Sequence, residues 1–125
     1  MDQKYIKCVL TLGYAIVSEK KDTTSNWFPV VNFYGIDGLH IATIPDHTMS
    51  TLFKALLVMN DAFADRGDSD VCSFAQGNQI LKLVWRAGWL HLLPKNLGES
   101  ESTDYLVSMD HPAALELYKA INQLA

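Results

Sequence analysis

The chain has 125 residues, a length typical of one domain and sufficient to bury a hydrophobic core without disulfides or a metal. Hydrophobic residues make up 49% and charged residues 19%, which excludes a disordered chain. The net charge of −4 lacks the basic excess typical of nucleic-acid-binding proteins, although it does not exclude a local basic stripe. Residues 63–125 carry most of this charge, with five basic and eight acidic side chains.

The N-terminal segment alternates apolar and polar residues and predicts β structure. Gly13 interrupts the alternation, so we expect strands at 4–12 and 14–19, or one strand with a bulge. The alternation places Cys8 and Tyr14 on the same face. Polar residues break the apolar run and no cleavage site follows it, so we expect neither a secretion signal nor a membrane span.

The two cysteines, Cys8 and Cys72, each lie in an apolar, strand-like segment. No C-x-x-C pattern is present for metal binding or redox chemistry, and two cysteines do not make a disulfide scaffold. We therefore expect two reduced core thiols in a cytoplasmic protein, where each behaves as a small hydrophobic residue.

Two further strands and a helix are predicted in the rest of the first half. The strands lie within 27–34 and 39–44 and are joined by a G-I-D-G turn, and Pro29 places the first of them at a sheet edge or a bulge. Apolar residues at helical spacing predict a helix over 47–65, with Asp46 as its N-cap. Arg66 and Gly67 are expected to close this helix.

The second half repeats this order of elements. Strands are predicted around 71–75, 80–86, 89–95 and 105–109. A final helix over 111–124 follows, with Asp110 as its N-cap and Pro112 in its first turn. The expected apolar stripe of this helix consists of Ala114, Leu117, Ile121 and Leu124.

This element order predicts an α+β fold, with antiparallel sheets and two helices in the order ββββα-ββββα. We expect a single α+β domain over residues 1–125, with pseudo-repeat halves at 1–66 and 67–125. The order is similar to that of whirly-type single-stranded nucleic-acid-binding proteins, but the analogy is in element order alone, since none of their motifs is present.

Two short similarities are consistent with an internal duplication. The tripeptides PDH (45–47) and MDH (109–111) each stand where a helix begins, and LFKAL (52–56) resembles LYKAI (117–121) at nearly the same offset. The alternative stays open, because two amphipathic helices resemble each other whatever their origin.

The segment WRAGWLHLLPKN (85–96) predicts a tight hairpin with Ala87 and Gly88 as its two-residue turn. This register pairs Trp85 with Leu90 on a fully apolar face, which we interpret as core. The opposite face mixes cationic, aromatic and aliphatic groups and suits partial exposure. Its candidate partner-binding residues are Lys82, Arg86, Trp89 and His91. The alternative is a surface cation–π pair without a partner.

No catalytic or metal-binding pattern is found in the sequence. The four histidines form no H-x-x-H or H-E-x-x-H pattern, and neither a nucleophile elbow nor a phosphate-binding loop is present. We therefore expect no catalytic residues, no metal and no cofactor. Two acidic clusters are either solvated loops or a patch that steers a basic partner, and their members are Asp65, Asp68, Asp70, Glu99, Glu101 and Asp104.

These observations favour a non-enzymatic, cytoplasmic protein-binding module. We expect an acidic inhibitor of the immunity-protein or antitoxin type, which neutralises a basic, nuclease-like protein partner through complementary charge. The alternative function is single-stranded nucleic-acid binding by an aromatic and basic sheet face.

Overall fold

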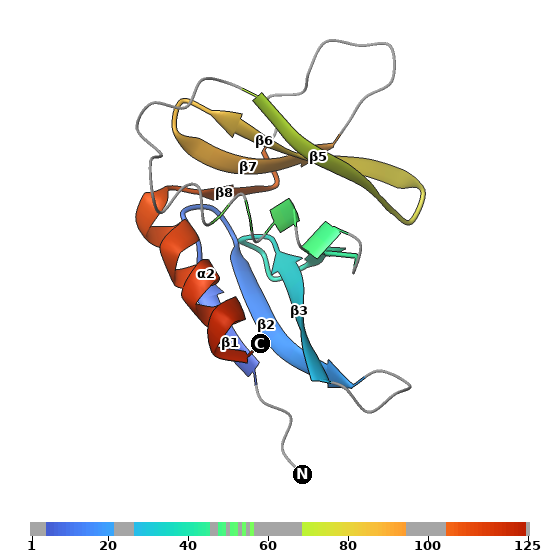
Figure 1. The fold of residues 1–125 in the computed structure, drawn as a ribbon. Coiled ribbons are helices and arrows are strands. Elements are labelled where there is room, and N and C mark those ends of the chain that lie inside the picture. The colour runs from blue at the N-terminus through green and yellow to red at the C-terminus, as the bar shows by residue number, and fades with distance from the viewer. Residues whose placement is uncertain are drawn as a thin grey trace.

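The computed structural model describes residues 5–21, 27–45, 69–94 and 105–124, together with residues 48, 49, 51, 52, 54 and 56. It contains two four-stranded antiparallel sheets and a C-terminal helix (Figure 1). Sheet A consists of β1 (Tyr5–Val9), β2 (Tyr14–Lys21), β3 (Trp27–Tyr34) and β4 (His40–Thr43), in that spatial order. Sheet B consists of β5 (Ser69–Gln76), β6 (Gln79–Arg86), β7 (Trp89–Pro94) and β8 (Val107–Met109), and α2 (His111–Leu124) follows it.

The strands end where the sequence places residues that suit tight turns. Gly13 separates β1 from β2 with φ +84°, as the predicted break requires. The predicted G-I-D-G turn is closed by a hydrogen bond from the Gly38 N–H to the Gly35 carbonyl at 3.0 Å. The prediction that Pro29 marks an edge strand or a bulge is wrong, because β3 lies between β2 and β4 and its bulge is at Phe33/Tyr34. Pro29 is tolerated because it stands outside the part of β3 that pairs with β4, so its missing N–H removes no bond from that ladder.

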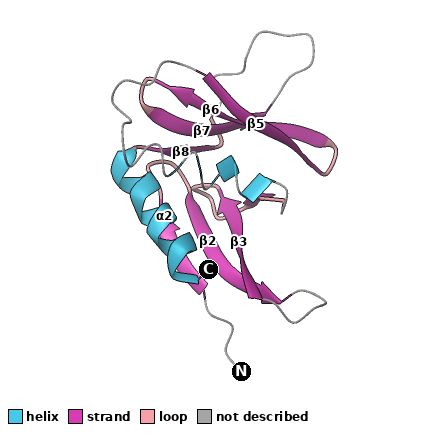
Figure 2. Cartoon of the chain, viewed as in Figure 1, coloured by secondary structure: helices cyan, strands magenta, loops and turns pink. Residues whose placement is uncertain are grey.

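Helix α2 has the predicted limits and the predicted N-cap. The Ala113 N–H donates to Asp110 Oδ1 at 3.0 Å, which satisfies one of the free donors of the first turn. All four residues of the predicted apolar stripe are buried. Although α2 follows sheet B in the chain, it packs across β1, β2 and β3 of sheet A (Figure 2).

The turn between β1 and β2 joins the two halves of the molecule. Leu12 exchanges two backbone hydrogen bonds with Ser108 of β8, at 3.0 and 3.2 Å. The neighbouring Thr11 hydroxyl accepts a hydrogen bond from the Asp110 N–H at 3.0 Å, where α2 begins. Sheet A is thus attached to both the last strand of sheet B and the start of the helix.

Most of the buried hydrophobic side chains of the described residues form one contiguous cluster. It includes the α2 face of sheet A, one face of sheet B, the apolar stripe of α2, and Leu52 and Leu56. Cys8 lies inside it, and both Cys8 and Cys72 are free thiols, as predicted. No helix among the described residues is long and apolar enough to cross a membrane.

Two further expectations about the first half are corrected. The described residues contain one helix with defined ends, α2, and not the two helices that were predicted. Six residues of the predicted helix over 47–65 have helical backbone. Its other residues, and Asp46, Arg66 and Gly67 at its predicted ends, lie outside the described residues. Tyr14 does not share a face with Cys8, because the turn at residues 10–13 reverses the chain and pairs Tyr14 with Val9. The internal duplication stays a prediction.

We predict that Gly13→Ala destabilises the fold far more than Gly77→Ala. Both glycines have positive φ, which costs an alanine about 1–2 kcal/mol. A Cβ at Gly13 would also lie 2.5 Å from the Tyr34 carbonyl oxygen, whereas a Cβ at Gly77 meets nothing within 4 Å. We therefore expect a loss of about 3 kcal/mol or more at Gly13, measured by urea unfolding. Equal losses at the two sites would contradict this account of the turn.

Candidate interaction surface on the first sheet

The hairpin of β6 and β7 has the register predicted from sequence. Ala87 and Gly88 form its turn with φ of +54° and +83°, and Arg86 pairs with Trp89. Trp85 pairs with Leu90, and both belong to the core cluster. The core interpretation of Trp85 is therefore confirmed.

The opposite face of this hairpin is more buried than we expected. His91 is only 6% exposed, and its neighbours on that face, Val84 and Leu93, are fully buried. The Tyr105 ring stacks on His91 at 3.8 Å, and His91 Nδ1 lies 2.7 Å from Ser108 Oγ. The expectation of partial exposure is wrong for His91, because a neighbouring ring and a hydroxyl satisfy the imidazole inside the fold.

The structure brings only part of the predicted partner-binding set together. Arg86, Trp89 and His91 are adjacent: the Trp89 and His91 rings are 6.0 Å apart, and Arg86 Nη1 donates to the Trp85 carbonyl at 2.7 Å. Trp89 is 38% exposed, and Lys82 and Arg86 are half-buried. The acidic candidates Asp65, Asp68, Glu99, Glu101 and Asp104, and the side chain of Asp70, lie outside the described residues.

A second accessible surface lies on sheet A, on the side away from α2. Side chains on this side alternate with the buried ones along every strand, and none of them is fully buried. We call this surface the tyrosine face. Its members are Tyr5, Lys7, Val9, Tyr14, Ile16, Ser18, Lys20, Phe28, Val30, Asn32, Tyr34, His40 and Thr43. None of these is acidic, in a chain whose net charge is −4.

A row of interacting side chains crosses the tyrosine face from β1 to β4. Lys7 Nζ lies 4.5 Å from the centre of the Tyr14 ring, and Tyr14 stacks on Tyr34 with 4.9 Å between ring centres. His40 meets Tyr34 edge-on at 5.5 Å, and its Nε2 lies 3.0 Å from Thr43 Oγ1. Because Lys7 and Tyr34 come from opposite neighbouring strands, they occupy the two sides of the Tyr14 ring.

Within the part of the chain that the structure describes, the most exposed large hydrophobic side chains lie on or beside this face. Val9 is 75% exposed and Tyr5 68%, both on β1. Ile36 and Leu39, in the turn between β3 and β4, are 85% and 68% exposed. A Cβ at Gly38 in this turn would lie 3.9 Å from the Tyr14 hydroxyl, so the turn borders the tyrosine face. Clustered exposed apolar groups of this kind mark interaction surfaces.

Sequence reasoning did not find the tyrosine face, because both faces of β1 and β2 carry apolar residues. The available signal was the tyrosines and lysines that share one phase of the alternation, Tyr5 and Lys7 before the turn and Tyr14 and Lys20 after it. That signal identifies a face only when the reversal at Gly13 is taken into account, since an uninterrupted alternation assigns Tyr14 to the core side.

The described residues hold no arrangement with evident catalytic chemistry. No group of three or more His, Cys, Asp or Glu in this part of the chain could hold a metal ion. Burial raises the pKa of the Cys8 and Cys72 thiols, which disfavours the thiolate. Ser108 and His91 form a close pair, but Ser108 is 4% exposed and His91 6%, so neither is open to a substrate.

No family model matches the chain, and no curated protein matches its sequence. The fold and its surfaces therefore carry the functional argument.

We predict that His91 makes the protein less stable at mildly acidic pH. Burial, with a smaller contribution from Arg86, lowers the pKa of His91 below its usual value near 6.5. The unfolded chain therefore takes up a proton that the folded chain resists, and the free energy of unfolding falls as the pH drops below about 6.5. Urea unfolding at pH 7.5 and pH 5 should show a larger loss in the wild type than in His91→Gln. Parallel pH curves for the two proteins would refute this.

The two hairpin tryptophans should differ sharply in their effect on stability. Trp85 is 4% exposed and lies in the core, so Trp85→Ala should cost about 3–5 kcal/mol. Trp89 is 38% exposed, and Trp89→Ala should cost far less. Thermal or urea unfolding measures both losses, and equal losses would contradict the assignment of Trp89 to the surface.

Proposed function

We propose that the chain is a protein-binding module that contacts its partner through the tyrosine face. The observation that carries this proposal is the location of the four most exposed large hydrophobic side chains among the described residues, which lie on this face or on the turn that borders it. Tyrosine suits such a contact because it combines a large apolar ring with a hydroxyl and loses little conformational freedom on binding. The neighbouring polar groups of Asn32, Thr43 and His40 add hydrogen-bonding capacity.

The chemistry of the partner is proposed from charge. The net charge of −4 and the acidic residues predicted to steer association favour a basic partner, such as a nuclease-like toxin that this chain would neutralise. The tyrosine face itself has no acidic member, so the steering charges lie elsewhere on the chain. In this proposal, long-range attraction and short-range contact are provided by different parts of the molecule.

Single-stranded nucleic-acid binding is the alternative, and it has less support. Bases bind such proteins by stacking on the free faces of aromatic rings. Lys7 and Tyr34 already occupy both sides of the Tyr14 ring, and Tyr105 stacks on His91. These rings therefore offer few free faces to bases, whereas their edges and hydroxyls remain suited to a protein surface.

Affinity capture with a paired control tests the proposal. The tagged wild type should retain a specific protein from a lysate of its native host, and the double variant Ile36→Asp/Leu39→Asp should lose at least nine-tenths of it, because two charges would enter a desolvated contact. Ile36 and Leu39 are exposed, so stability should change little. Ile80→Asp, also at an exposed apolar residue but on β6 of sheet B, serves as the control and should bind normally.

The identity of the captured species separates the two functions. Recovery of single-stranded nucleic acid without protein, with affinity that falls steeply as salt rises, would replace the proposal with the alternative. Equal loss of the protein in the double variant and in the Ile80→Asp control would remove the tyrosine face as its site.

A further inference from the structure

We propose that the outer edge of β1, together with α2, binds an extended segment of a protein partner as an added strand. The segment carries an acidic residue opposite Lys7, with apolar residues two positions away on either side. This site does not rest on the proposed function: it uses the outward backbone groups of β1 and a groove beside α2, although Tyr5, Lys7 and Val9 of β1 also belong to the tyrosine face.

The first observation is the direction of the backbone groups of β1. This strand is at the edge of sheet A, and no described strand pairs with its outer side. Hydrogen-bonded and non-hydrogen-bonded pairs alternate along an antiparallel ladder. The Leu10 N–H donates to the Gly13 carbonyl at 3.1 Å, so the next pair, Val9 with Tyr14, is a non-hydrogen-bonded one. By the same alternation, Tyr5, Lys7 and Val9 direct their backbone N–H and C=O groups outward.

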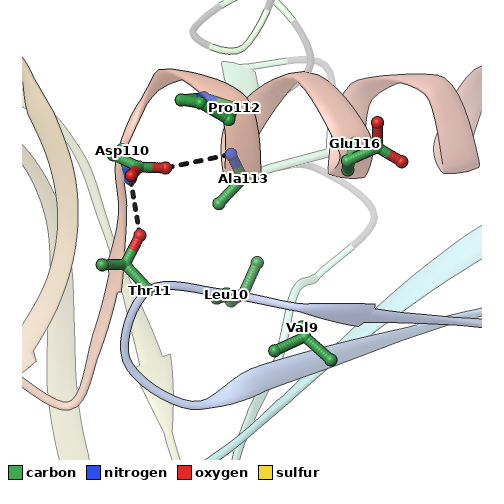
Figure 3. A pocket seen from close by; sticks show the side chains of 7 residues that line it. All are labelled: Val9, Leu10, Thr11, Asp110, Pro112, Ala113 and Glu116. Carbon is green, nitrogen blue, oxygen red and sulfur yellow. Dashed lines mark hydrogen bonds between the residues drawn. The ribbon is translucent and has the colours of Figure 1, made fainter.

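The second observation is a groove beside this edge, made of two adjoining hollows. One, of about 330 Å³, lies between the end of β1 and the first turns of α2, among Val9, Leu10, Thr11, Asp110, Pro112, Ala113 and Glu116 (Figure 3). The other, of about 400 Å³, continues along the helix as far as Gln123. Both hollows are lined by Val9 and Glu116, so they adjoin, and we call the pair the groove.

The dimensions of the groove suit an extended segment. The five residues of β1 span about 17 Å and the fourteen residues of α2 about 21 Å. An added strand of five to seven residues would match this length, with its backbone bonded to β1. Every second side chain would then point toward α2, where Ala113 and Ala120 leave room for small apolar groups.

Lys7 determines which occupant the edge prefers. In the register that pairs the outward residues of two copies of this chain, Lys7 faces Lys7, and like charges in direct opposition weaken a strand pair. A lysine on an exposed edge strand is a known protection against such self-pairing. An acidic residue in that position instead forms a favourable cross-strand pair, while Tyr5 and Val9, both largely exposed, pair with apolar or β-branched residues.

Peptide binding tests this proposal without knowledge of the natural partner. The probe is a fluorescein-labelled peptide, Thr-Val-Ala-Glu-Ala-Val-Thr, read by fluorescence anisotropy and by amide NMR shifts of the protein. The wild type should bind it with shifts concentrated in Tyr5–Val9 and along α2, and it should bind the peptide with Lys in place of Glu roughly tenfold more weakly. Methylation of the Glu amide nitrogen should abolish binding, because it removes the donor to the Lys7 carbonyl.

A charge exchange provides the matched control. Lys7→Glu should reverse the order of the two peptides, whereas Lys20→Glu, the same charge change on β2 of the same face, should leave the order unchanged. Equal binding of the two peptides, no binding, or shifts confined to β3 and β4 would overturn the proposal. Concentration-dependent shifts of β1 without peptide would overturn it in favour of a second copy. The Ile36→Asp/Leu39→Asp variant, which should lose the captured protein, should bind the peptide normally. The capture experiment and the peptide experiment can therefore fail independently of each other.

Discussion

The attachment of the β1–β2 turn to the second half of the chain determines the rest of the architecture. Leu12 bonds to Ser108 in β8, and Thr11 bonds to the Asp110 N–H at the start of α2. Gly13 permits this approach, since any side chain there would collide with the Tyr34 carbonyl. With the turn held in this way, α2 begins at the edge of sheet A and packs across β1, β2 and β3. Both sheets and the helix therefore contribute side chains to one hydrophobic cluster.

The same arrangement leaves one face of sheet A without cover from the described helix. Helix α2 buries one face, and the tyrosine face remains accessible on the other. The cross-strand row on that face stabilises the sheet by ring stacking and a cation–π contact, each worth about 0.5–1 kcal/mol. It thereby holds the half-buried rings of Tyr14 and Tyr34 in place, and a prearranged surface loses less conformational freedom when it binds.

Local features of the fold were predictable from the sequence, and long-range ones were not. The Ala87–Gly88 turn, the limits of α2 and the Asp110 cap depend on residues within a few positions of one another, and all were confirmed. The burial of His91 depends on Ser108 in β8 and on Tyr105 just before that strand, and the sequence does not place these residues beside it. The choice of the accessible face of sheet A depends on where α2 lands, about a hundred residues further along the chain. The candidate interaction surface is therefore on sheet A, whereas the sequence predicted it on the β6–β7 hairpin of sheet B.

The two proposed contacts share β1, which couples them physically. Lys7 directs its backbone groups to the edge, while its ammonium lies over the Tyr14 ring on the tyrosine face. An exposed cation–π contact and an exposed ion pair have similar free energies, each at most about 1 kcal/mol. A carboxylate bound beside Lys7 would therefore draw the ammonium away from Tyr14 at little cost and uncover one side of that ring. A segment in the groove would thus add a strand to sheet A and alter its tyrosine face at the same time, so that occupancy of the edge adjusts what the face can bind.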